Sequence, residues 1–230
     1  HFKAAARRQP EEPGIHLGMA NSHQLLGDIA SAEACLEKEL MLSPDSAQAA
    51  VNLGWILEEQ NRVPEALMQY RKALYYNPNH PDLRWNHGLA CLMLGDYARG
   101  WRDYEFRWKA RNKQKPTHNK PEWKGDPLNG RSLLLYTEQG FGDTIMFLRF
   151  AQQMGRANDR ISLQCQPQLK RFFSAQPEFE NVVAKGEKRP AHDLHAPLMS
   201  LPLLLKLTRE NDFHSQAYLS PDELSIVPIP

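Results

Sequence analysis

The sequence predicts two folded parts: about three helical hairpins stacked as an α-helical array over residues 1–110, and a single parallel α/β domain over residues 131–230, joined by a linker at 111–130. Two observations carry this prediction. In the first part, particular residue types recur at one constant interval, which is typical of helical repeats. In the second part, short continuous apolar runs alternate with amphipathic segments, which is typical of strands alternating with helices.

The repeat is visible in five registers that share one period. Pro10, Pro44 and Pro78 are equally spaced along the chain. The other registers with this interval are Gly27, Asn61 and Gly95; Ala32, Ala66 and Gly100; Leu36, Tyr70 and Tyr104; and Gly54 and Gly88. We therefore expect helices near residues 14–26, 30–42, 47–60, 63–76, 82–94 and 97–110.

Each register has a physical role in such a hairpin. The small residues of the Ala32 register allow two antiparallel helices to approach closely. The larger residues four positions later lie on the same helical face and fill the hairpin core. The Gly27 register suits a left-handed residue that closes the first helix. Each proline lies beyond the second helix and ends it.

Three short motifs in the second and third hairpins match a known repeat. They are Asn52-Leu53-Gly54, Pro64-Glu65-Ala66 and Asn77-Pro78-Asn79, and with them the first part resembles the tetratricopeptide family. The first hairpin departs from the pattern because Met19-Ala20 replaces Leu-Gly, so we expect it to cap the array or to continue from further repeats. Stacked hairpins curve, and their first helices line a concave face suited to extended peptides.

Asn52 and Asn86 lie one period apart on the predicted first helices. A side-chain amide has both a donor and an acceptor, so it can pair with a peptide backbone. In the repeat arrays of O-linked N-acetylglucosamine transferases an asparagine ladder at this position holds substrate peptide, and the resemblance implies the same role here. The alternative is that both amides satisfy neighbouring backbone groups or face water. The first hairpin has Gly18 at this register.

The linker contains a basic run over 109–115, followed by Pro116, which indicates an exposed connector. Such a run can hold a phosphate, although a solvated linker is the commoner explanation. We expect Trp123 to pack against the next domain. Strands are predicted at 132–136, 160–165, 181–184 and 192–196, with helices at 143–155 and 168–175. This alternation predicts a parallel, doubly wound sheet.

The loop 138–143 leaves the first strand and enters a helix, which is where open α/β sheets bind ligands. Gly140 and Gly142 permit close approach of a ligand to the backbone, and the helix N-terminus offers N–H groups. We therefore expect Gly140, Phe141, Gly142 and Thr144 to contact substrate.

Several motifs of the second half resemble one class of bacterial protein. The motifs are Pro121-x-Trp123-x-Gly125, Gly130-Arg131-Ser132, Glu138-Gln139-Gly140-Phe141-Gly142-Asp143-Thr144, Arg149-Phe150 and Asp193-x-His195-x-Pro197. Together they resemble tetratricopeptide proteins that carry a glycosyltransferase-like domain, related to heptosyltransferases of the GT-B type with two Rossmann-like domains. The resemblance implies that residues 131–230 are the Rossmann-like, acceptor-side half of a GT-B fold. In heptosyltransferases the Gly-Asp after the first strand carries a proposed catalytic base, which corresponds to Asp143 here.

Asp143 is therefore the candidate base, because an acceptor hydroxyl must lose its proton as it attacks the anomeric carbon. The alternative is that Asp143 caps the helix by accepting backbone N–H bonds. A fully capped carboxylate is a poor base because those bonds lower its pKa. Glu138 is the rival base, and its alternative is a surface position beside the turn. Arg149 is expected to pair with an acid rather than with phosphate.

His195 lies in a predicted strand, where it is expected to touch the acceptor or to be a structural histidine. His192, Asp193 and His195 include metal-ligating types, but no partner cluster supports a metal site. We expect no metal and no cofactor. The protein has 28 Lys and Arg against 27 Asp and Glu, so neither nucleic acid nor an anionic membrane is an expected partner.

Three well-separated cysteines, Cys35, Cys91 and Cys165, favour a reducing, cytoplasmic location, and no apolar run reaches the ~18 residues of a membrane span. The expected function is a glycosyltransferase fragment, whose repeats recruit a polypeptide or glycan acceptor. The alternative is a non-catalytic interaction adaptor with a degenerate α/β domain. A GT-B enzyme binds its nucleotide sugar mainly in a second domain, so we expect the natural protein to be longer and this chain alone to lack turnover.

Overall fold

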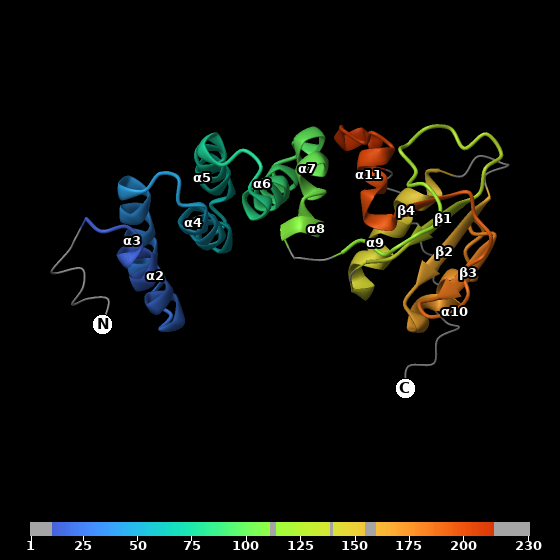
Figure 1. The fold of residues 1–230 in the computed structure, drawn as a ribbon, viewed down its shortest axis with the longest axis horizontal. Helices are drawn as coiled ribbons and strands as arrows, with labels where there is room; N and C mark the ends of the chain where they lie inside the picture. The colour runs from blue at the N-terminus through green and yellow to red at the C-terminus, as the bar shows by residue number, and fades with distance from the viewer. Residues whose placement is uncertain (1–10, 111–113, 139, 155–159, 214–230) are drawn as a thin grey trace. The chain divides into compact units, whose positions relative to one another are not determined.

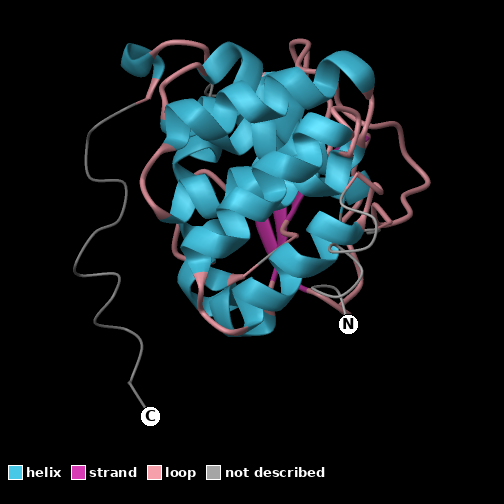
Figure 2. Cartoon of the chain, turned by 90° about the vertical axis from the view of Figure 1, so that its left-hand side faces the viewer, coloured by secondary structure: helices cyan, strands magenta, loops and turns pink. Residues whose placement is uncertain are grey.

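The computed structural model describes residues 11–110, 114–138, 140–154 and 160–213. The chain divides into two units, residues 1–115 and 116–230, and each is described by itself. The predicted order, helical hairpins followed by a small parallel α/β sheet, is confirmed (Figure 1). Helices account for most of the regular structure, and the strands are short (Figure 2). Among the described residues, no helix has the combined length and apolar character that crossing a membrane requires.

The first unit consists of antiparallel helix pairs that follow one another along the chain (Figure 1). The helices are α2 Ile15–Leu25, α3 Ile29–Leu42, α4 Ala47–Glu59, α5 Val63–Tyr76, α6 Pro81–Met93, α7 Tyr97–Tyr104 and α8 Arg107–Ala110. We call α2, α4 and α6 the first helices and α3, α5 and α7 the second helices of the hairpins. Pro44 and Pro78 follow α3 and α5 as predicted, whereas Pro10 lies outside the described residues.

The turns between paired helices have the predicted left-handed backbone. Gly27, Asn61 and Gly95 have φ angles of 73°, 61° and 78°. The second helices of the first and third hairpins then begin with a side-chain cap, because Asp28 accepts from the Ser31 N–H and Asp96 from the Arg99 N–H. The turn register of the sequence is thus explained by helix capping.

Close helix packing explains the small-residue registers. A Cβ at Gly54 would overlap the ring of Tyr70, and a Cβ at Gly88 would lie 2.8 Å from the backbone nitrogen of Tyr104. Ala32 and Ala66 are fully buried. Neighbouring helices therefore approach to distances at which a larger side chain does not fit.

The prediction of one continuous helix over 97–110 is wrong, because α7 ends at Tyr104 and a separate helix, α8, begins at Arg107. The break accompanies the burial of Arg107, which is only 2% exposed. Its guanidinium lies 4.9 Å from the Tyr104 ring centroid and 5.0 Å from the Trp108 ring centroid, and it donates to Glu105 Oε1 at 2.6 Å. Helical periodicity alone does not predict such a buried cation.

The second unit is built on a four-stranded parallel sheet in the order β3-β2-β1-β4. Its elements are β1 Leu133–Tyr136, α9 Phe141–Gln152, β2 Ile161–Cys165, α10 Lys170–Phe173, β3 Asn181–Ala184, β4 Leu194–Pro197 and α11 Leu201–Leu204, with 3₁₀ turns η1 Pro167–Leu169, η2 Leu198–Ser200 and η3 Glu210–Asp212. β2 and β4 flank β1, so the strand order reverses beside β1. The sheet therefore has the switch point at which α/β folds bind ligands.

Three predicted elements of this unit are shorter or shifted, the first being the helix expected at 143–155, which begins at Phe141 and ends at Gln152. The helix expected at 168–175 is a 3₁₀ turn followed by α10, whose Phe172 and Phe173 are buried. The fourth strand begins at Leu194 rather than at 192. Asp193 instead accepts hydrogen bonds from the N–H and the hydroxyl of Ser132, at 2.8 and 2.9 Å.

The segment 116–130 packs on the sheet of the second unit. Trp123 is 4% exposed, as expected, and its backbone N–H donates to the carbonyl of His195 at 2.8 Å. His118 stacks on His195 with ring centroids 3.8 Å apart. Gly125 has φ +91°, and a Cβ there would overlap the carbonyl oxygen of Leu204.

Candidate functional site

The first helices carry a chain of side-chain amides that joins two hairpins. Gln48 Nε2 donates to Asn52 Oδ1 at 2.7 Å, and Asn52 Nδ2 donates to Asn21 Oδ1 at 3.0 Å. Gln48 and Asn52 belong to α4, whereas Asn21 belongs to α2. The amide chain therefore crosses from the second hairpin to the first.

Asn86, the other predicted member of the ladder, is placed differently. Its Nδ2 donates to the backbone carbonyl of Asp82 on the same helix, at 2.9 Å. This bond to the residue four positions earlier is one of the local pairings open to an asparagine within a helix. The amide chain formed by the described residues thus contains Asn52 but not Asn86.

Three residues of this face were missed by the sequence reasoning. Gln48 and Asn21 were overlooked because neither stands at the register of Asn52, although Gln48 is one helical turn away. Trp55 is 53% exposed and lies three residues after Asn52, hence on the same side of α4. Trp55 also lies one period from Asn21, so comparing the register position by position would have found both.

In the second unit, the loop after β1 lies at the switch point of the sheet. α9 begins at Phe141, and Gly140 is its N-cap without a side-chain capping bond. Asp143 is the third residue of the helix and half-buried, so the suggestion that it caps α9 is wrong. Its carboxylate lies in the first helical turn, where backbone N–H groups and the helix dipole favour negative charge.

The two glycines of this loop are not required by the surrounding packing. Gly140 has φ −66°, which any residue adopts. A Cβ at Gly140 or Gly142 would meet no atom within 4 Å. Phe141 between them is 48% exposed, and Glu138 at the other end of the loop is half-buried. Both glycines consequently expose their backbone to approach from outside.

Gln166, which follows β2, holds this loop in place through hydrogen bonds to two threonine side chains. It accepts from the Thr137 hydroxyl at 3.1 Å and donates to the Thr144 hydroxyl at 3.0 Å. The Thr144 hydroxyl donates in turn to the carbonyl of Gly140 at 2.9 Å. Thr144 is only 2% exposed, so it holds the loop in shape from inside. Gln166 carried no sequence signal because it is distant from Thr144 along the chain.

The histidines near β4 form an aromatic stack. His195 is 8% exposed and its ring lies 3.8 Å from that of His118, which also stacks on Tyr136 at 4.8 Å. Burial, together with the nearby His195, Arg189 and His192, lowers the pKa of His118 to about 4. The stacked ring of His195 adds to this effect, because a like charge close by disfavours the protonated form of His118.

No metal site is formed by the His, Cys, Asp and Glu side chains of the described residues. His192 Nδ1 faces the carbonyl of Pro190 at 2.8 Å. The carboxylate of Asp193 accepts hydrogen bonds from the N–H and the hydroxyl of Ser132, and these bonds lower the pKa of its carboxyl group. His192 and Asp193, two of the three residues of metal-ligating type in this segment, thus have structural partners.

A cysteine, a histidine and an aspartate also meet in the third hairpin. His87 Nδ1 lies 2.7 Å from Asp103 Oδ2, and the sulfur of Cys91 lies 3.8 Å from both ring nitrogens of His87. Cys91 is fully buried, and burial raises the pKa of its thiol to about 11. Because the thiolate is the nucleophilic form, this trio is not arranged for covalent catalysis. Arg84 completes the buried network by donating to Asp103 Oδ1 at 3.1 Å.

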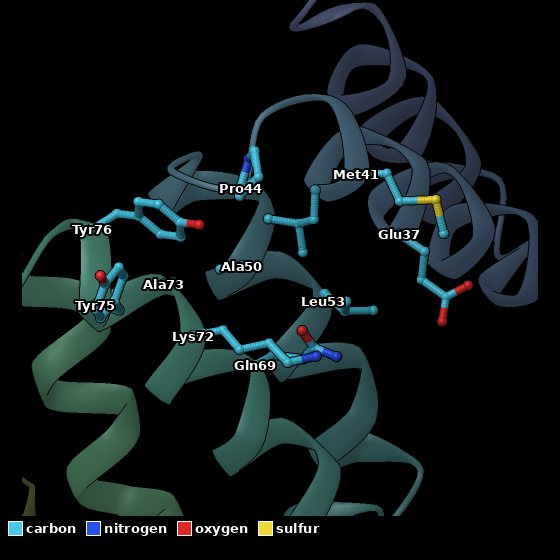
Figure 3. Close-up of a pocket in the computed structure, with 11 residues that line it drawn as sticks. Glu37, Met41, Pro44, Ala50, Leu53, Gln69, Lys72, Ala73, Tyr75 and Tyr76 are labelled. Atoms are coloured by element: carbon cyan, nitrogen blue, oxygen red, sulfur yellow. The ribbon is translucent and has the colours of Figure 1, made fainter.

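A hollow of about 500 Å³ opens between α3, α4 and α5 (Figure 3). Met41 and Glu37 project from α3 on one side, and Tyr76 and Lys72 from α5 on the other (Figure 3). This volume falls in the range of small-ligand sites. The hollow lies beside the second helices and includes none of the amide-chain residues, so it is a separate recess of the repeat unit.

Comparison with known proteins supports the repeat assignment. A tetratricopeptide-repeat family model matches residues 17–75, and the chain carries tetratricopeptide repeats there. Protein FlbA of Caulobacter vibrioides is 28% identical over 152 residues, which cover 64% of this chain and 25% of FlbA. The probable biofilm formation methyltransferase WspC of Pseudomonas putida is 34% identical over 97 residues, 41% of this chain and 23% of WspC. The chain thus spans about a quarter of the length of these two relatives.

Solved structures of low similarity were also found. An O-GlcNAc transferase mutant from Thermobaculum terrenum has a TM-score of 0.39 and 16% identity, covering 73% of this chain and 40% of that one. The crystal structure of MamA protein has a TM-score of 0.42 and 20% identity, covering 48% of this chain and 61% of that one.

Proposed function

We propose that the repeat unit binds an extended polypeptide along the face formed by its first helices. The observation that carries the proposal is the amide chain of Gln48, Asn52 and Asn21, which bridges two hairpins. Amides held in such a chain are oriented in advance, so less conformational entropy is lost when a peptide backbone pairs with them. Asn86 stands at the same register on α6. A bound peptide can compete with the backbone carbonyl of Asp82 for the hydrogen bond that the Asn86 amide donates.

Peptide binding by the full chain tests this function. A library of fluorescently labelled 15-residue peptides supplies binders, and anisotropy gives their Kd values. The double variant Asn21→Ala, Asn52→Ala is expected to weaken binding by about 30-fold, because each of the two lost backbone hydrogen bonds contributes ~1 kcal/mol. Gln69→Ala is the matched control, since Gln69 lines the hollow beside the second helices. Equal affinities of the double variant and the unmodified chain contradict the proposal.

A second candidate function belongs to the α/β unit: the acceptor-side half of a GT-B glycosyltransferase. What favours it is the half-buried Asp143 in the first turn of α9, at the switch point, beside two glycines whose backbones are open to approach. A carboxylate there can take the proton of an attacking acceptor hydroxyl. As the glycosyl group is transferred, negative charge develops on the departing nucleoside diphosphate and must be stabilised. In a GT-B fold the nucleotide-sugar donor binds mainly in a further domain, which would supply this stabilisation.

The activity test uses the natural full-length protein and a panel of nucleotide sugars. Asp143→Asn is expected to lower kcat for transfer or donor hydrolysis by at least about 100-fold. Glu138→Gln tests the rival candidate base in the same assay. Glu180→Gln is the control, because Glu180 is an exposed partner of Arg160 in the same unit. Unchanged turnover in Asp143→Asn removes the base assignment. Peptide binding without any turnover instead supports the adaptor function, in which the α/β unit has no catalytic role.

A further inference from the structure

Four residues of α4 form one stripe along the first-helix face. Gln48, Asn52, Trp55 and Glu59 are spaced by four, three and four residues, which places them on one side of a helix. We call them the α4 stripe. Gln48 and Glu59 are exposed, Asn52 is half-buried, and Trp55 is 53% exposed. The stripe therefore continues the amide chain with a large aromatic surface and a carboxylate.

An exposed indole with a carboxylate one turn away suits a cationic side chain. The face of a tryptophan ring attracts Lys and Arg more strongly than other aromatic rings do. A guanidinium is planar and can stack on the ring while its N–H groups reach a carboxylate. Trp55 and Glu59 provide these two contacts at a separation of four residues.

The charges of the first helices agree with a cationic partner. α2 contains no Asp, Glu, Lys or Arg, and α4 and α6 together contain three carboxylates, Glu58, Glu59 and Asp82, against the single cation Arg84. Arg84 donates to Asp103 at 3.1 Å and to the carbonyl of Pro78 at 2.6 Å. The second helices α3, α5 and α7, by contrast, contain five acidic and five basic residues. Formal negative charge is thus in excess on the first helices only, and Glu59 is the exposed carboxylate of α4, because Glu58 is half-buried and burial raises the pKa of its carboxyl group.

Apolar side chains flank the carboxylate along the array. Leu25 and Met93 lie one period before and one period after Glu59, and they are 89% and 61% exposed. A peptide that crosses the first helices therefore meets an apolar group on each neighbouring hairpin. This pattern fits a basic residue placed between apolar residues.

We infer that the first-helix face recognises an arginine between apolar residues in an extended polypeptide, with the guanidinium stacked on Trp55 and paired with Glu59. The inference rests on the proposed peptide-binding function and specifies its ligand. The amides of Asn52 and Asn21 hold the peptide backbone, whereas Trp55 and Glu59 select the side chain.

Titration calorimetry with three synthetic nonapeptides tests the selectivity of the full chain. The peptides differ only in the residue between two central leucines, which is Arg, Gln or Pro. The Arg peptide is expected to bind about tenfold more tightly than the Gln peptide, and added salt should reduce this ratio. Glu59→Gln and Trp55→Ala should each bring the ratio close to one, and Trp55→Phe should retain part of it. Glu37→Gln, which removes an exposed carboxylate of α3, should leave it unchanged. Circular dichroism confirms that each variant is folded.

The possible results distinguish a failure of arginine selection from a failure of the proposed peptide binding. Equal binding of the Arg and Gln peptides, or tighter binding of the Pro peptide, overturns arginine selection, while sensitivity to Asn21→Ala, Asn52→Ala keeps the peptide site. An undiminished Arg preference in Glu59→Gln overturns the assigned contact. Absence of binding by all three peptides, or binding that the double asparagine variant does not weaken, overturns both.

Discussion

Glycines serve different purposes in the two units. In the repeat unit, Gly54 and Gly88 are required by packing, because a Cβ at either would collide with the neighbouring helix. In the α/β unit, Gly140 and Gly142 have open space around the position of a Cβ. A glycine in this sequence can therefore mark either a packing requirement or a backbone that is open to approach. Only the contacts around it distinguish the two.

Histidines show a parallel contrast. His87 in the repeat unit lies 2.7 Å from the carboxylate of Asp103. His118 in the α/β unit is surrounded by His195, His192, Arg189 and the ring of Tyr136, and the first three of these disfavour its protonation. The two histidines therefore have different neighbours: a carboxylate in the repeat unit, and an arginine and two imidazoles in the α/β unit.

The largest expected effect is the loss of a carboxylate in the repeat unit. Asp103→Ala leaves His87 and Arg84 without their common partner inside a buried network. Removal of one member of a buried charged network costs about 3–4 kcal/mol. Urea unfolding followed by circular dichroism measures the change. Asp45→Ala, at an exposed loop position, should change stability by less than ~0.5 kcal/mol.

Gly88→Ala tests the packing role of glycine directly. The added methyl group would lie 2.8 Å from the Tyr104 nitrogen and 2.9 Å from the Asp103 carbonyl carbon, so α6 and α7 must separate. We expect a loss of about 2–3 kcal/mol in the free energy of unfolding, because backbone atoms cannot move aside as a flexible side chain does. A stabilised Gly88→Ala variant would refute close packing as the reason for this glycine.

Acid should weaken the α/β unit through His118. Its pKa is about 4 in the folded protein and ~6.5 in the unfolded chain, so the unfolded chain binds the proton first. Stability is therefore lost as the pH falls from ~6.5 to ~4, by roughly 2 kcal/mol once screening by solvent is allowed for. A histidine NMR titration of the folded protein measures the pKa, and a midpoint above 6 contradicts the burial effect. In His118→Gln, the loss of stability over this pH range should be smaller.

Gly142→Ala is expected to have the smallest effect and the opposite sign. Gly142 is the second residue of α9, and alanine favours the helix by up to ~1 kcal/mol where no contact opposes it. Thermal unfolding should show an unchanged or raised Tm. If the backbone at this loop contacts substrate, activity of the full-length protein should fall while stability does not. A destabilised variant would show that Gly142 is a packing glycine like Gly88.

Much of the repeat unit was predictable because its contacts recur at a fixed spacing. The turn residues Gly27, Asn61 and Gly95 and the core residues Leu36, Tyr70 and Tyr104 follow from one repeat period. The amide chain was only partly predictable. Asn52 stands at a register position, whereas its partners Gln48 and Asn21 depend on side-chain orientation.

In the α/β unit, the strands and the loop position were predictable from apolar runs and glycines, but the supports of the loop were not. Gln166 reaches Thr144 from 22 residues away, and Asp193 reaches Ser132 from 61 residues away. No local pattern encodes such pairs.

The sequence alone determined the hairpin period, the parallel strands and the place of the loop before α9, because these depend on local periodicity and turn chemistry. Only the tertiary structure decided that Asp143 does not cap its helix, that Thr144 is buried beneath the loop, and that the amides of Asn52 and Asn21 pair across two hairpins. The physical reason is that burial and side-chain partnership arise from residues distant in sequence, and these are brought together only when the chain is packed.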